Sequence, residues 1–157
     1  MRVQGLRHRD LLASMAKRSR FFMVAPAKMG LFEETHGQNE VGSRFFEGAA
    51  AGAVMIGQAP DCEAYREHFD WPDAVIPVNP DGSDILEILR SISSDPGHFV
   101  AISSRNAVES LRRHDWVYRW RQILALAGLE PTPALLDREL RLAKLADVGS
   151  SLVCRTR

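Results

Sequence analysis

The segment Val41–Gly57, with the sequence VGSRFFEGAAAGAVMIG, constrains the fold more than any other part of the chain. Its first half predicts a helix with Ser43 as the N-cap, followed by charged and aromatic residues in the first turns. The small side chains of residues 48–51 would let this helix lie close to a sheet, and Gly52 is suited to end it. Residues 53–56 then predict a short buried strand. A loop, a capped helix start and a strand in this order indicate a ligand site at one edge of a nucleotide-binding α/β sheet.

The rest of the chain alternates predicted helices and strands. Apolar residues at helical spacing predict helices, and short apolar runs bounded by turn residues predict strands. We expect helices over residues 10–18, 60–67, 85–92, 96–114, 115–127 and 133–146, strands over residues 20–24, 53–56 and 74–78, a polar loop over residues 27–40, and weak structure after Asp147. This order predicts an α/β fold, a Rossmann-like parallel sheet with flanking helices and a helical C-terminal end. Three strands are few for such a sheet, which favours a fragment of a larger domain.

Composition and charge exclude several classes of protein. The chain has 157 residues, enough for one hydrophobic core, and its 20 basic and 20 acidic residues balance. No overall basic field favours nucleic acid as a partner. Basic residues gather at Arg2–Arg20 and at Arg112–Arg121. We interpret both clusters as solvated helix faces, with a phosphate-facing or membrane-facing patch as the alternative.

Cysteine and histidine usage argues against a metal site and a secreted protein. Cys62 and Cys154 are the two cysteines and form no C-x-x-C pair, and the five histidines are scattered. Charged residues follow Met1, so no signal peptide is expected, and no apolar run approaches the ~20 residues of a membrane span. P-loop, G-x-G-x-x-G and G-x-S-x-G motifs are missing from the sequence. We therefore expect a cytoplasmic protein with no transmembrane segment, no bound metal and no cofactor.

The run RFFEGAAAGAVMIG, residues 44–57, resembles the donor-binding segment of GT-B glycosyltransferases, in the branch that includes the CgeB-like spore protein glycosyltransferase domain. The resemblance extends from about Asp10 to about His114. It implies that residues 1–128 are part of a C-terminal, nucleotide-sugar-binding domain, followed by a C-terminal helix and tail over residues 129–157. It also implies that the acceptor domain and the first strands of the donor domain are missing. A separate acceptor-domain polypeptide would then be a partner.

The same resemblance implies roles for residues near the start of the predicted helix. Glu47 matches the glutamate that holds the ribose hydroxyls of the donor. Ser43, Arg44 and nearby backbone N–H groups would hold the diphosphate, and Gly42 would permit close backbone approach to a ligand. From residue chemistry alone, Glu47 is also explained as a surface carboxylate stabilised by the helix dipole, Ser43 as a simple cap, and Arg44 as a solvated or ion-paired side chain.

Contact with the donor sugar is less well defined. Members of the resembled family often carry two glutamates separated by seven residues, of which the first contacts the sugar. At that first position this chain has Asn39, with Glu40 beside it. Either Glu40 serves from a shifted loop, or Asn39 substitutes, or the role is vacant. His36 in the same loop could touch the sugar, although a lone loop histidine is usually just exposed.

The resemblance implies transfer of a sugar from a nucleotide-diphospho-sugar to an unknown glycan, lipid or protein acceptor, without a bound metal. No catalytic residue is assigned, because the family usually places the base in the missing domain. The main alternative is a non-catalytic nucleotide-sugar-binding module, or a structural remnant that needs a partner acceptor domain. A third possibility is a basic adaptor at anionic surfaces, whose binding would depend strongly on salt.

Overall fold

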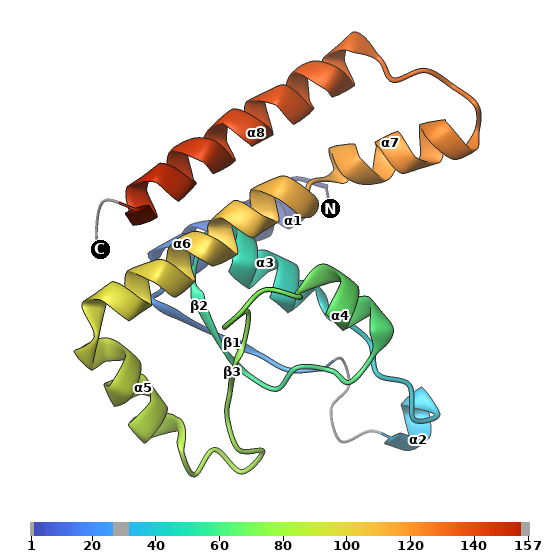
Figure 1. The fold of residues 1–157 in the computed structure, drawn as a ribbon. Coiled ribbons are helices and arrows are strands. Elements are labelled where there is room, and N and C mark those ends of the chain that lie inside the picture. Colours follow the sequence, from blue (N-terminus) through green and yellow to red (C-terminus); the bar gives the residue numbers. More distant parts are fainter. Residues whose placement is uncertain (1, 27–31, 155–157) are drawn as a thin grey trace.

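The computed structural model describes residues 2–26 and 32–154 as a small parallel sheet surrounded by helices (Figure 1). In chain order the elements are α1 (Arg2–Arg18), β1 (Phe21–Val24), α2 (Phe32–Thr35), α3 (Ser43–Ala51), β2 (Val54–Gly57), α4 (Glu63–His68), β3 (Ile76–Pro77), α5 (Ile85–Ser94), α6 (Pro96–Arg113), α7 (Trp116–Leu126) and α8 (Pro133–Cys154).

The sheet has three parallel strands in the order β1-β2-β3, which confirms the predicted parallel sheet. Phe21 pairs with Val54 at one end of the β1–β2 ladder, and Ile56 pairs with Ile76 on the other side of β2. All four residues of β2 are buried, because this central strand is covered on both faces. Pro77 lacks a backbone N–H to donate, which suits the position of its strand at the edge of the sheet.

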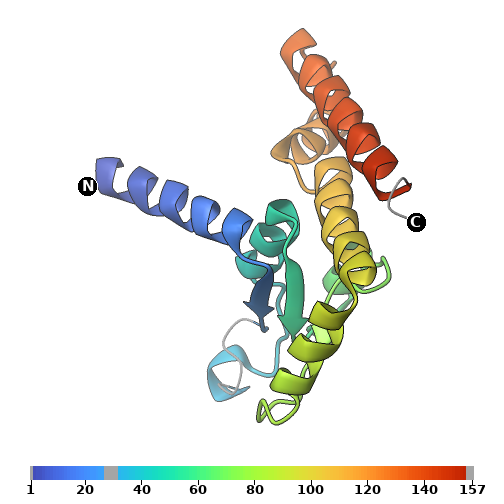
Figure 2. The same ribbon diagram turned by 90° about the vertical axis from the view of Figure 1, so that its left-hand side faces the viewer.

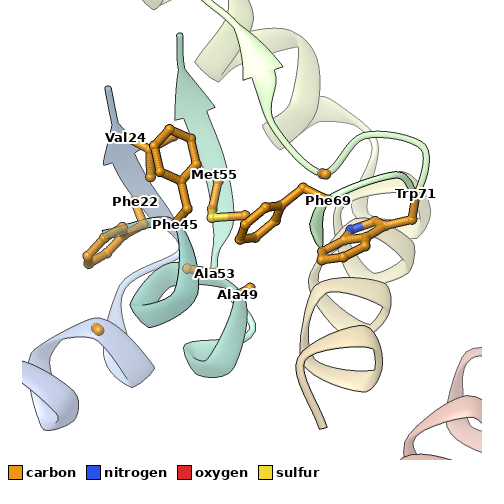
Figure 3. Close-up of a cluster of buried hydrophobic side chains, with 10 residues drawn as sticks. Phe22, Val24, Phe45, Ala49, Ala53, Met55, Phe69 and Trp71 are labelled. Carbon is orange, nitrogen blue, oxygen red and sulfur yellow. The ribbon is translucent and has the colours of Figure 1, made fainter. Parts of the chain in front are cut away.

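Helices cover both faces of the sheet. On one face, Phe45 and Ala49 of α3 pack on β1 and β2 with Phe69 and Trp71, which follow α4 (Figure 3). On the other face, apolar residues of α5 and α6 pack on the opposite side of β2, among them Ile85, Ile88, Leu89, Ile92, Phe99 and Ile102. The result is a three-layer α/β arrangement of the Rossmann-like kind.

Gly48 explains how closely α3 approaches the sheet. A Cβ atom added at this position would lie 2.8 Å from Sδ of Met55 and 3.0 Å from a ring carbon of Phe22. A larger residue would therefore push the helix outward or displace both side chains. This confirms the prediction that the small residues of the segment allow close packing of helix on sheet.

A buried amide on α6 joins three separate parts of the chain. Asn106 is fully buried, and its Nδ2 group donates to the Ala53 carbonyl at 2.9 Å. Its Oδ1 atom accepts from the indole Nε1–H of Trp71 at 2.8 Å. One turn earlier, the Ser103 hydroxyl donates to the Gly52 carbonyl. These bonds attach α6 to the turn between α3 and β2 and to the segment after α4.

The C-terminal helix runs farther than the sequence predicts. The expected helix ends at Ala146 with weak structure after Asp147, whereas α8 continues to Cys154 beside α6 (Figure 1). Gly149 meets α6 so closely that an added Cβ would lie 2.9 Å from Cγ2 of Val108. Arg112 also contacts Asp147 and the Ser150 hydroxyl. Tertiary packing therefore extends a helix whose local sequence predicts an earlier end.

Other boundaries also differ from the expectation. α1 begins at Arg2 rather than at residue 10, since the Arg, Gln and Leu residues before that position are good helix formers. The predicted polar loop over residues 27–40 contains the short helix α2, and its residues 27–31 lie outside the described residues. The predicted helix starts at Asp95–Pro96 and Asp115 are confirmed, because both aspartates cap their helices through the side chain.

We predict that Asn106→Leu lowers the free energy of unfolding by roughly 2–4 kcal/mol, because the Trp71 N–H and the Ala53 carbonyl would both lose a buried hydrogen-bond partner. Urea unfolding, monitored by circular dichroism, measures this change in the free energy of unfolding. The exposed Asn39→Leu serves as the matched control and should change stability by less than about 0.5 kcal/mol. Equal effects of the two substitutions would contradict the role given to Asn106.

Candidate functional site

Helix α3 begins one residue earlier than predicted, because its N-cap is the residue before Ser43. Gly42 is the N-cap, with extended backbone (φ −67°, ψ 156°), and its carbonyl accepts the Phe45 N–H at 3.2 Å. Ser43 is the first helical residue and is exposed, so the predicted N-cap role of Ser43 is wrong. The preceding glycine adopts the cap geometry without a side chain, which shifts the start of the helix. Gly52 ends the helix in the left-handed conformation (φ 66°), as predicted.

The two faces of α3 have different roles. Phe45, Gly48 and Ala49 are buried against the sheet. The opposite face lines a cavity of about 520 Å³, here called the α1–α3 cavity, formed by Arg9, Leu12, Ala13, Ala16, Lys17, Ser43, Glu47, Ala50 and Ala51. Its lining includes two basic side chains and one carboxylate.

A second cavity lies beside the outer face of α3, on the side toward α6. This α3–α6 cavity has a volume of about 350 Å³ and is lined by Phe46, Glu47, Ala50, Ala107, Ser110, Leu111, His114, Asp115, Trp116 and Leu142. Glu47 and Ala50 belong to both cavities. Figure 2 shows the reason, since α1 and α6 stand on either side of α3.

Glu47 carries an unusual carboxylate at the meeting point of the two cavities. Its Oε2 atom is buried and has no hydrogen-bond partner, although the side chain as a whole is 36% exposed. Nε of Arg44 lies 3.9 Å from Oε2, which is an ion pair but too long for a hydrogen bond. A buried oxygen without a donor is costly, so such an atom in a native protein calls for an explanation.

His114 provides the second such atom within the described part of the chain, its Nδ1. Its backbone N–H caps the end of α6 by donating to the Ser110 carbonyl, and its ring packs among aromatic rings, with centroids 5.0 Å from Phe46 and 4.9 Å from Phe69. Burial lowers the pKa of His114 below its ordinary 6.5, and the nearby Arg119 and Arg113 add to this effect. Burial and Arg119 likewise lower the pKa of His68.

The structure brings together only some of the predicted site residues. Ser43 and Glu47 line one cavity, and Arg44, 58% exposed, pairs with Glu47. His36, Asn39 and Glu40 are exposed in the segment between α2 and α3 and line neither cavity.

Gly42 is only partly buried. An added Cβ there would meet the Ala25 carbonyl oxygen at 3.9 Å, an ordinary contact. Packing within the chain therefore does not require a glycine at this position.

Sequence reasoning did not single out Arg9, Lys17 or His114. Arg9 and Lys17 lie eight residues apart on one face of α1. Their helical spacing within the Arg2–Arg20 cluster is the sequence signal that could have identified them. The sequence alone favours a solvated face for this cluster. His114 gave no local signal, because its neighbours Phe46 and His68 come from distant parts of the sequence.

A further cavity of about 230 Å³ lies at the carboxyl ends of the strands, where ligands of open α/β sheets usually bind. It is lined by residues such as Val24, Gly57 and Asp81, and by none of the predicted site residues. In residues 2–26 and 32–154, no three His, Cys, Asp or Glu side chains gather in a way that would hold a metal ion. No helix among them is both long and apolar enough to cross a membrane.

We predict that stability decreases as the pH falls from about 7 to about 5. The pKa of His114 and that of His68 are lowered in the folded state, so the unfolded chain binds protons first. Their contribution is therefore complete above the unfolded pKa and is lost as the pH falls through the folded pKa. Urea unfolding at a series of pH values should show a smaller decrease for His114→Gln than for the wild type. An identical slope in both proteins would contradict this account of His114.

Comparison with known proteins identifies a family for this chain. The sequence model of a family described as glycosyl transferase-like matches residues 2–125. This range includes the residues of α1 and α3 that line the α1–α3 cavity. Neither a curated protein nor a solved structure matches the chain. Because the family match covers most of its length, the chain belongs to the glycosyl transferase-like family.

Proposed function

We propose that the chain binds a nucleotide-diphospho-sugar on the outer face of α3 and takes part in sugar transfer to a hydroxyl acceptor. In this proposal it acts as the donor-binding, C-terminal domain of a GT-B glycosyltransferase of the CgeB-like kind. The observation that carries the proposal is the carboxylate of Glu47, which lines a cavity together with the basic side chains of Arg9 and Lys17 and whose Oε2 atom lacks a hydrogen-bond donor. A ribose hydroxyl would supply the missing donor.

The α1–α3 cavity suits the anionic part of such a donor. Arg9 and Lys17 bring two positive charges to it, and Ser43 lies at the start of α3, where unpaired backbone N–H groups and the helix dipole favour anions. Arg44, the residue after Ser43, is exposed. Its side chain is free to turn toward a phosphate, because its ion pair with Glu47 is long. A diphosphate would therefore meet positive charge from two helices.

The reaction would break the bond between the anomeric carbon and the diphosphate oxygen and form a bond to the acceptor oxygen. The negative charge that develops on the leaving diphosphate would be offset by the basic side chains and helix N–H groups, without a metal. The proton of the acceptor hydroxyl would pass to a base that we do not assign to this chain. The proposal does not identify the acceptor, which is a glycan, lipid or protein. It also does not identify the polypeptide that presents this acceptor.

Sugar contact by the loop residues is a separate part of the proposal. For Asn39, Glu40 or His36 to touch the donor sugar, the segment between α2 and α3 would have to approach cavities that it does not line. Their contribution to nucleotide binding should therefore be small.

We predict that Glu47→Gln weakens binding of UDP or GDP, whichever the protein prefers, by roughly 10- to 100-fold, because hydrogen bonds to a charged group contribute about 1.5–3 kcal/mol. Titration calorimetry with both nucleotides and their glucose and mannose conjugates measures this loss. Glu40→Gln, a matched carboxylate outside both cavities, should bind the free nucleotide like the wild type.

Lys17→Gln adds a second arm to this experiment. It should weaken binding of the nucleoside diphosphate more than binding of the nucleoside, because it removes charge that faces the phosphates. Binding without transfer, when an acceptor domain is supplied, would identify a non-catalytic binding module. No nucleotide binding by a folded wild-type protein would exclude the proposed function.

A further inference from the structure

Helix α8 carries apolar residues on more than the face that packs against α6. Leu142 and Ala146 are buried on that packed face. Leu140 lies only two residues before Leu142, which places the two side chains on nearly opposite sides of the helix. Leu136 and Leu140 are 46% and 56% exposed. A helix with apolar residues on a second face calls for a second neighbour.

The exposed residues form a regular stripe, here called the α8 stripe, which consists of Leu136, Leu140 and Ala143. The three residues follow one another at spacings of four and three, so they share one side of the helix, and all three are exposed. Figure 1 shows α8 along the upper edge of the molecule, with α6 and α7 on the same side of it. The stripe lines neither the α1–α3 cavity nor the α3–α6 cavity. It is therefore an open face that belongs to neither candidate site.

The charges of α8 do not select a strongly charged partner. The helix has three acidic and three basic residues, namely Asp137, Glu139, Asp147, Arg138, Arg141 and Lys144. Two of them already pair with residues of the preceding segment, Arg138 with Asp115 and Glu139 with Arg121. Balanced charge creates no field of one sign that would attract nucleic acid or an anionic membrane. A second copy of the same neutral helix would meet no net repulsion.

The order of the charges beside the stripe fits a second copy in the antiparallel orientation. Asp137 precedes Leu140 by three residues and Lys144 follows it by four, so both flank Leu140 on the same side of the helix. Asp137 pairs with Arg141 of its own helix at 3.1 Å, and Lys144 has no ion pair among the residues that the structure describes. An antiparallel second α8 would bring its Lys144 to Asp137 and its Asp137 to Lys144. A parallel copy would set like charges level with each other.

The apolar residues of the stripe agree with this orientation. When Asp137 lies opposite Lys144 of the second copy, Leu140 lies against Ala143 of that copy, which sets a large side chain against a small one. The dipoles of the two helices then oppose each other, which is favourable. Because α8 has 22 residues, the paired helices are long enough for the whole stripe to be covered.

We propose that a second copy of this chain docks on the α8 stripe, so that two α8 helices pack antiparallel across a twofold axis. Each contact then occurs twice, because Asp137 of either copy meets Lys144 of the other. Self-association through α8 is independent of the proposed function, since the stripe borders neither of the cavities assigned to a ligand.

Sedimentation-velocity ultracentrifugation of the full chain over a wide concentration range tests the dimer. Leu140→Gln should raise the dissociation constant of the dimer by roughly 10- to 100-fold, because the burial of a leucine is lost in both copies. Leu126→Gln is the matched control, since Leu126 is 90% exposed at the end of α7 and away from the stripe. It should associate like the wild type. Thermal unfolding shows that each variant is folded before association is measured.

Two charge variants test the antiparallel orientation. Asp137→Lys and Lys144→Asp, each alone, should raise the dissociation constant by roughly three- to tenfold, because each sets like charges against each other in both contacts. An equimolar mixture of the two variants should associate like the wild type, since every contact then joins a lysine to an aspartate. A change that merely perturbed the α8 helix would not be repaired by mixing.

The proposal is overturned if the wild type is a monomer at every concentration. Binding of that monomer to phosphatidylcholine vesicles or to another polypeptide, lost in Leu140→Gln, would then assign the stripe to a different occupant. The proposal is equally overturned if Leu126→Gln weakens the dimer as much as Leu140→Gln does, or if the mixed charge variants associate no more tightly than each variant alone. Nucleotide binding by Leu140→Gln should match that of the wild type, so failure of the dimer leaves the proposed function untouched.

Discussion

The buried amide of Asn106 is the interaction on which the arrangement of the site depends. It binds the carbonyl of Ala53 and the indole of Trp71 at the same time, so α6 cannot move without breaking buried hydrogen bonds. Because α6 carries one wall of the α3–α6 cavity and ends at His114, the position of that wall relative to α3 follows from this amide. Together with the Ser103 hydroxyl, which binds the Gly52 carbonyl one turn earlier, this amide holds the wall beside Glu47 in place.

Helix α3 gives the molecule both its core and its candidate site. Its inner face uses Gly48 and Ala49 to lie close to the sheet, and its outer face presents Ser43 and Glu47 to the cavities. The chemistry of these two faces follows from the helical repeat, since residues four apart fall on the same side. The small inner residues therefore determine how deeply the outer carboxylate is set between α1 and α6.

Local patterns in the sequence predicted the parts of the fold that depend on local physics. The parallel sheet, the close packing of Gly48, the helix end at Gly52 and the helix starts at Asp95–Pro96 and Asp115 all agree with the structure. The family resemblance was likewise confirmed at the level of a glycosyl transferase-like protein.

The remaining features depend on contacts between distant residues. The extension of α8 past Asp147 comes from its packing on α6, and the cap of α3 moved to Gly42 because backbone geometry outweighed the preference of Ser43. The grouping of His114 with Glu47 joins residues far apart in the chain, which no spacing rule reveals. The structure therefore adds to the candidate site a partner that periodicity could not supply.

The position of Glu47 between two cavities has a thermodynamic consequence. One carboxylate borders both spaces, so an occupant of either one changes the charge and the hydrogen-bonding capacity that the other encounters. Thermodynamic linkage then requires reciprocity. If a ligand in the α1–α3 cavity changes the affinity of the α3–α6 cavity by some factor, a ligand in the α3–α6 cavity changes the affinity of the α1–α3 cavity by the same factor. Through a single side chain, two neighbouring sites would behave as one cooperative unit.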